Sequence, residues 1–185
     1  MVPVDQLWMP IVLAAVFVFI ASSVIHMATP MHKSDMKKLP EEDAVGAAMR
    51  KAGVGPGDYL MPCPGSMKEM GAPEFQEKYR RGPVAFLTVL PSAPPAMGKA
   101  LGSWFVFCLL VSFFVAYITG LACPAGTHYG QVFQVAGSVA ILGYAFSNVT
   151  NSIWKSVAWG TTLRFVVDGM IYALVTAGTF GWLWP

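Results

Sequence analysis

The residues best suited to chemistry lie in the segment VIHMATPMHKSD, residues 24–35, where an apolar run gives way to charged residues. The segment holds His26, His32 and Asp35 within ten residues, together with two methionines. Imidazole, thioether and carboxylate groups can together bind copper or another soft-to-borderline metal ion. The segment is therefore a candidate metal site with His26, His32 and Asp35 as its ligands.

Helical geometry opposes this metal site. His26 and His32 are six residues apart, which is about 240° around a continuous helix, so their side chains would face away from each other. Pro30 would break such a helix, and the two rings could then converge, although nothing requires it. We therefore favour a membrane exit with His26 at the headgroup level and His32 solvated. A metal- or cofactor-binding enzyme is the alternative.

Arg164 and Asp168 form a second candidate site. Asp168 is the one ionisable group well inside an apolar segment, and such residues are costly and often functional. Arg164 precedes it by one helical turn, where the two side chains can pair. We expect an intramembrane ion pair between Arg164 and Asp168, with a small transporter around it as the weaker alternative.

Reaction motifs are missing from the sequence. It contains no HExxH motif and no Ser/His/Asp set or carboxylate pair that would indicate a reaction. It also gives no sign of a bound cofactor. The net charge of +2 is too small to indicate a nucleic-acid partner. These observations favour a protein that is not an enzyme.

Four apolar segments must position these residues. The chain has 185 residues, 55% hydrophobic and 12% charged, whereas soluble domains carry about 25% charged residues. Each segment approaches the roughly 20 residues that cross a bilayer as a helix. The segments are Leu7–Met27, Leu101–Leu121, Gln131–Ser147 and Leu163–Trp184. We expect an all-α integral membrane protein in which residues 1–27 form the first transmembrane helix and residues 101–185 form the other three.

Residues 28–100 form a large insertion between the first two spans. Ten of the twelve Lys and Arg residues lie here and the other two near the fourth span, so the positive-inside rule places both regions in the cytoplasm. Both termini would then be periplasmic in a bacterial inner membrane. Helices are expected at Pro40–Lys51 and Pro73–Arg80, and residues 83–91 are expected to be extended and to pair with residues 58–62. Eight carboxylates nearly balance the ten basic residues, which favours a solvated small domain or a docking surface.

Small residues recur every fourth position in two of the spans. Such rows let helices pack closely in lipid. One row consists of Cys108, Ser112, Ala116 and Gly120, and the other of Gly169, Ala173, Ala177 and Gly181. The second span is bulky elsewhere, from Trp104 to Tyr117, and we expect those side chains to face lipid or another subunit.

Several stretches of the chain are familiar as a set. They are IHMATPMHKSDMKKLPEEDAV, PGDYLMP, PPAMGK, SIWK and GTFGWLWP. Together they resemble an uncharacterised family of small four-span bacterial inner-membrane proteins. The resemblance implies the topology and brings no activity or site residue. The sequence thus predicts a non-catalytic accessory subunit of a larger membrane complex, respiratory or photosynthetic, whose partners are lipid and other subunits or further copies of itself.

Overall fold

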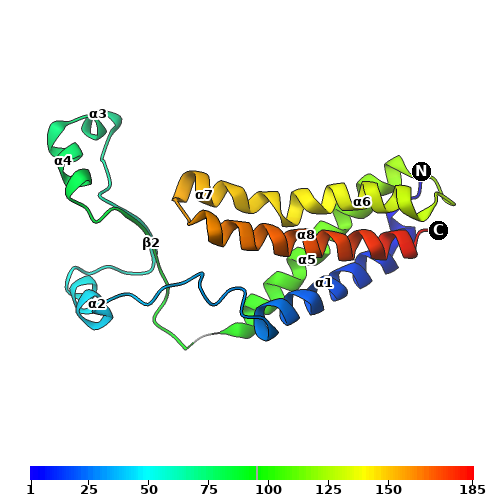
Figure 1. The fold of residues 1–185 in the computed structure, drawn as a ribbon, viewed down its shortest axis with the longest axis horizontal. Coiled ribbons are helices and arrows are strands. Elements are labelled where there is room, and N and C mark those ends of the chain that lie inside the picture. Colours follow the sequence, from blue (N-terminus) through cyan, green and yellow to red (C-terminus); the bar gives the residue numbers. More distant parts are fainter. Residues whose placement is uncertain (95) are drawn as a thin grey trace. The chain divides into compact units, whose positions relative to one another are not determined.

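Four long helices form the main unit of the chain. The computed structural model describes residues 1–94 and 96–185. The main unit comprises Met1–Met36 and Ala96–Pro185. Its long helices are α1 (Trp8–Ala28), α5 (Met97–Ala122), α6 (Tyr129–Tyr144) and α8 (Trp159–Trp182) (Figure 1). Four helical segments here are long and apolar enough to cross a membrane, the third running on to Lys155, so the four predicted spans are confirmed as apolar helices.

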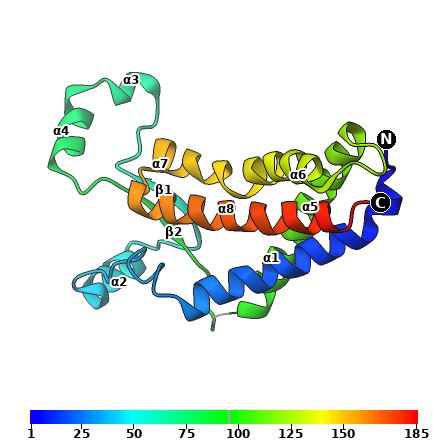
Figure 2. The same ribbon diagram turned by 45° about the vertical axis from the view of Figure 1, so that its right-hand side comes forward.

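The four helices pack in a ring. α1 contacts α5 and α8, and α6 contacts the same two helices, with the most extensive packing between α6 and α8. Both termini lie at one end of the bundle (Figures 1 and 2). The Val2 amide donates to the Gly120 carbonyl at 2.9 Å, and the Gly126 amide donates to the Pro185 carbonyl at 2.6 Å. The short helix η1 (Val4–Leu7) precedes α1, while η2 (Phe146–Asn148) and α7 (Val149–Lys155) connect α6 to α8 at the other end.

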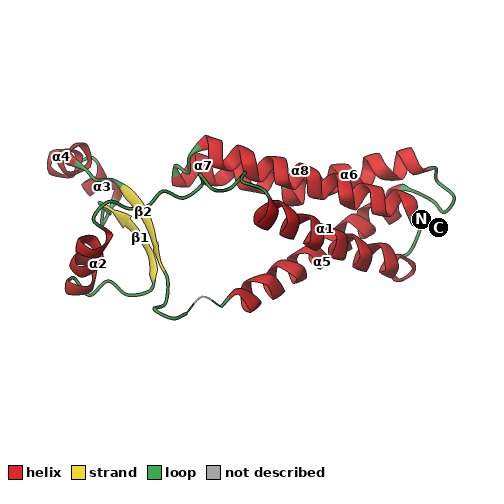
Figure 3. Cartoon of the chain, turned by 60° about the horizontal axis from the view of Figure 1, so that its bottom comes forward, coloured by secondary structure: helices red, strands yellow, loops and turns green. Residues whose placement is uncertain are grey.

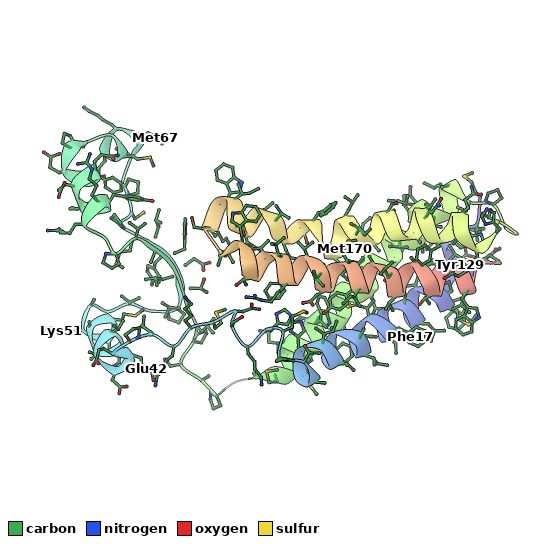
Figure 4. All side chains as sticks on the ribbon, viewed as in Figure 1. Phe17, Glu42, Lys51, Met67, Tyr129 and Met170 are labelled. Atoms are coloured by element: carbon green, nitrogen blue, oxygen red, sulfur yellow. The ribbon has the colours of Figure 1, made fainter. Side chains whose placement is uncertain are left out.

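The small residues lie at the contacts between helices. A Cβ placed on Gly169 would lie 2.5 Å from backbone atoms of Tyr144 and Ala145, so α8 and α6 touch through their backbones here. At Gly181, near the end of α8, the neighbour is a side chain: an added Cβ would lie 2.7 Å from the ring of Tyr129, which is labelled in Figure 4. All eight residues of the two rows are buried except Gly181, which is half-buried.

Two bulky residues of α5 differ from expectation. Phe105 is half-buried and packs edge-on against Phe19 of α1, and Trp104 is half-buried too. Phe113, Phe114 and Tyr117 are exposed on the outside of the bundle. Trp104 instead points inward, where its indole N–H donates to Ser22 Oγ on α1 at 2.9 Å. An indole N–H needs an acceptor when buried, and Ser22 provides it.

Residues 37–95 form a second, separate unit. It contains α2 (Glu42–Lys51), β1 (Gly57–Met61), α3 (Met67–Met70), α4 (Pro73–Arg81) and β2 (Ala85–Val89). The two strands pair antiparallel, from Gly57 opposite Val89 to Met61 opposite Ala85 (Figure 3). The two predicted helices and the predicted strand pairing are therefore confirmed. Residues 28–36, which we assigned to the insertion, belong to the main unit, and residue 95 lies outside the described residues.

Candidate metal centre

The end of α1 brings His26 and His32 together. α1 ends at Ala28, because Pro30 disfavours a helical conformation for the residue before it, and Thr29 is extended. A turn follows, in which the Lys33 amide donates to the Pro30 carbonyl and the Asp35 amide donates to the His32 carbonyl, both at 3.1 Å. The chain thereby folds back on the last turn of α1. The centroids of the two imidazole rings are 4.3 Å apart.

Asp168 on α8 completes the cluster. Its Oδ2 atom lies 2.9 Å from Nε2 of His32 and 3.7 Å from Nε2 of His26. The three residues each present one ligand atom, and these atoms all lie within 4.8 Å of one another. The Asp168 side chain is 2% exposed, His32 is 14% exposed and His26 is 41% exposed. The cluster is thus buried on the side of α8 and open on the side of His26.

Asp35 fixes the orientation of His32. Its Oδ2 atom accepts a hydrogen bond from Nδ1 of His32 at 2.6 Å. Its Oδ1 atom accepts from the guanidinium of Arg164, with Nε and Nη2 both at 2.6 Å. Burial alone would raise the pKa of Asp35, but the hydrogen bonds and charges of His32 and Arg164 outweigh it and lower the pKa below its usual value. Asp35 is therefore ionised at neutral pH and holds the proton of His32 on Nδ1.

The position of the His32 proton on Nδ1 determines how Nε2 of His32 meets the Asp168 carboxylate. With the proton on Nδ1, a neutral His32 presents a lone pair at Nε2. The Nε2 atom lies 2.9 Å from Oδ2 of Asp168, but the angles are not those of a hydrogen bond. Among the described residues, neither oxygen of Asp168 has a hydrogen-bond partner, and Nε2 of His32 has none either. Two acceptor atoms this close repel each other unless a proton or a metal ion bound beside both of them offsets the repulsion.

Three expectations from the sequence need correction. In the structure Arg164 pairs with Asp35, and no ion pair between Arg164 and Asp168 is found among the described residues. Asp35 contacts Nδ1 of His32, on the side away from Asp168, so it lies outside the cluster of His26, His32 and Asp168 that could hold a metal ion. His32 is largely buried and not solvated, because the turn packs it against Phe165 of α8, with ring centroids 5.2 Å apart.

No protein-family model, curated protein or solved structure matches this chain. The chemistry of the site therefore follows from its own residues. Asp168 is the candidate ligand that the sequence did not indicate, because the nearby Arg164 offered a simpler partner at helical spacing. The sequence did contain a signal for the pair of Asp168 and His26: Asp168 lies inside the fourth span, at about the same depth as His26 at the end of the first span.

Proposed function

We propose that this protein binds a divalent first-row transition-metal ion, such as zinc or iron(II), through His26, His32 and Asp168 at one boundary of a membrane. The observation that carries the proposal is the convergence of three ligand atoms within 4.8 Å of one another. The buried ones, Nε2 of His32 and the carboxylate oxygens of Asp168, have no hydrogen-bond partner among the described residues. Two imidazoles and a carboxylate form a ligand set found in zinc and non-haem iron sites.

The spacing of the ligand atoms supports this proposal. Ligands at about 2.1 Å from one metal ion are about 3.0–3.4 Å apart for angles near 90–110°. The distances of 2.9 Å and 3.7 Å from Asp168 Oδ2 to the two Nε2 atoms bracket that range. The local charges also fit a cation. Arg164 pairs with Asp35, and among the described residues Asp168 faces two histidines and no Lys or Arg.

The support of His32 by Asp35 is typical of metal sites. Metal-binding histidines usually donate their other ring N–H to a carboxylate or carbonyl, which fixes the ring and makes it a stronger ligand. The His32–Asp35 hydrogen bond of 2.6 Å has this arrangement. Three protein ligands leave coordination positions open, and a metal ion held in this way can polarise a substrate oxygen or activate a water molecule.

Metal content tests the proposal. We expect the protein, purified from membranes without chelator, to contain close to one transition-metal ion per chain, measured by inductively coupled plasma mass spectrometry. After the native metal is removed, added Co²⁺ should occupy the empty site and give visible absorption bands. Protein that contains no metal and shows no Co²⁺ bands would rule the proposal out.

Asp35→Asn should weaken metal binding without abolishing it. The neutral amide forms no ion pair with Arg164 and is a weaker acceptor for the Nδ1–H group of His32. His32 therefore loses its fixed tautomer. Changes in such supporting groups typically cost about 10–100-fold in metal affinity, and we expect a loss of this size in a Co²⁺ titration. Asp43→Asn, a matched change in an exposed residue of α2, should leave the affinity unchanged. Equal affinities for both variants would contradict the supporting role of Asp35.

We further propose that the chain spans a bacterial inner membrane with residues 37–95 in the cytoplasm. Cys63 allows a direct test, because its thiol is exposed while Cys108 and Cys123 are buried. A membrane-impermeant maleimide should label inside-out vesicles and leave right-side-out vesicles unlabelled, with Cys63→Ser as the control. Labelling of Cys63 only in right-side-out vesicles would reverse the proposed orientation.

A role as an accessory subunit is our second proposal, supported by the small core of residues 37–95. Among the described residues of this unit only Phe75 is buried. A domain of about 60 residues ordinarily needs a larger core to be stable alone, so a partner surface is a reasonable source of further stabilisation. Purification in mild detergent at native abundance should then recover a complex of several different chains. Recovery of the chain alone would count against this role.

A further inference from the structure

A cavity of about 520 Å³ lies between the four long helices beside the metal centre. Small-molecule sites typically enclose about 300–1,000 Å³, with apolar walls and a few convergent polar groups. Two of the three proposed ligands, His26 and Asp168, form part of its wall. The open side of the metal centre and the cavity are therefore continuous.

The rest of the cavity wall is largely apolar. Trp104 stands in the middle of it, with its ring 5.7 Å from that of Tyr172 and 6.3 Å from that of Tyr144. The Tyr172 hydroxyl is buried and has no hydrogen-bond partner among the described residues. The site thus combines an aromatic wall with one free hydroxyl and two metal ligands.

The rim of the cavity is exposed and apolar. The beginning of α5 diverges from the end of α1 (Figure 3), and Met27 of α1 and Met97 of α5 both line the cavity. Met97, Leu101 and Phe107 of α5 line the cavity and are 63%, 43% and 40% exposed. If α5 spans the bilayer, these side chains meet lipid, so a molecule dissolved in the bilayer has a more direct path to the cavity than one dissolved in water.

We infer that the cavity binds a long-chain carboxylate, that is, a fatty acid, with its hydrocarbon chain against Trp104 and its carboxylate on the metal. The inference rests on the proposed metal site. Charge selects this head group, because a divalent ion together with Asp168 has a net charge of +1, which one carboxylate neutralises. The apolar wall and the lipid-facing rim favour a ligand with a long hydrocarbon chain.

The test uses the full chain in phosphatidylcholine nanodiscs, with Co²⁺ in the metal site and oleate as the probe. Oleate should change the visible absorption bands of bound Co²⁺, because its carboxylate enters the coordination sphere. Methyl oleate, which has the same chain without the charge, should leave the bands unchanged at the same mole fraction.

Variants of α5 test whether the hydrocarbon chain of the fatty acid lies in this cavity. Ala100 lines the cavity, and Ala100→Trp fills it without changing a metal ligand. This variant should bind Co²⁺ as the wild type does and need at least about tenfold more oleate for half of the spectral change, a loss of 1.4 kcal/mol. The matched control is Ala122→Trp, at an exposed position near the other end of α5, which should behave as the wild type.

The outcomes separate the two proposals. Co²⁺ bands that do not respond to oleate, or that respond equally to methyl oleate, would overturn the fatty-acid site and leave the metal site standing. An unchanged oleate response in Ala100→Trp would show that the hydrocarbon chain of oleate does not lie in this cavity. The absence of Co²⁺ bands in the wild type would overturn the metal site, and the fatty-acid site with it.

Discussion

Asp168→Ala is expected to weaken Co²⁺ binding by more than about 100-fold. Loss of a residue that only supports a ligand costs about 10–100-fold, and Asp168 is the only acidic residue among the three proposed direct ligands. The measurement is a Co²⁺ titration of the metal-free protein in detergent, followed by the visible absorption bands. Asp5→Ala, in an exposed residue of η1, is the matched control and should bind Co²⁺ as the wild type does.

The stability of the metal-free protein distinguishes a ligand from a structural ion-pair partner. Without a cation, the Asp168 carboxylate is buried without a hydrogen bond to any described residue, which is unfavourable. Metal-free Asp168→Asn should therefore unfold at a temperature equal to or above that of the metal-free wild type. Metal should raise the unfolding temperature of the wild type alone, because ligand binding stabilises the folded state. If Asp168→Asn instead lowered stability and kept its metal affinity, Asp168 would be a structural ion-pair partner of His32.

Gly169→Ala is the substitution expected to cost most in stability. The added Cβ would lie 2.5 Å from the Cα of Ala145 and from the carbonyl carbon and oxygen of Tyr144. Because these are backbone atoms, they cannot move aside as a side chain can, and α6 and α8 must separate. Overpacking of this kind costs about 1–3 kcal/mol, and we expect the upper end of that range in a denaturant titration in detergent micelles.

A second glycine of the bundle provides the control. Gly102 lies in α5 with no atom near the position of an added Cβ. Alanine is the better helix former by up to about 1 kcal/mol, so Gly102→Ala should leave stability unchanged or raise it slightly. If Gly169→Ala matched Gly102→Ala, the close backbone contact between α6 and α8 would be wrong.

The spans and the elements of residues 37–95, apart from the short helix α3, were predictable because each depends on local sequence. Hydropathy alone identifies helices of bilayer length. Pro40, the acidic first turn and Gly53 predict the helix that the structure has as α2, and Gly53 has the positive φ of 72° that suits a residue after a helix. The short extended run PVAFLTVLP, residues 83–91, predicted the strand β2. Neighbours in sequence determine all of these features.

The metal centre was only partly predictable because its contacts are distant in sequence. Arg164 and Asp35 are 129 residues apart, whereas the helical spacing of Arg164 and Asp168 suggested a pair that the structure does not contain. His26 and His32 were identified as candidate ligands, but the turn after Pro30 had to be known before their rings could be placed together. Trp104 was misplaced for a similar reason, since its partner Ser22 lies on another helix.

X-ray absorption at the edge of the bound metal tests the central claim most directly. For the wild-type protein we expect a nearest shell of nitrogen and oxygen atoms at about 2.0–2.2 Å, with outer-shell scattering from two imidazole rings. His26→Ala, saturated with metal, should show scattering from one ring. A sulfur shell at about 2.3 Å, or imidazole scattering that is unchanged in His26→Ala, would show that the metal binds elsewhere and would contradict the site formed by His26, His32 and Asp168.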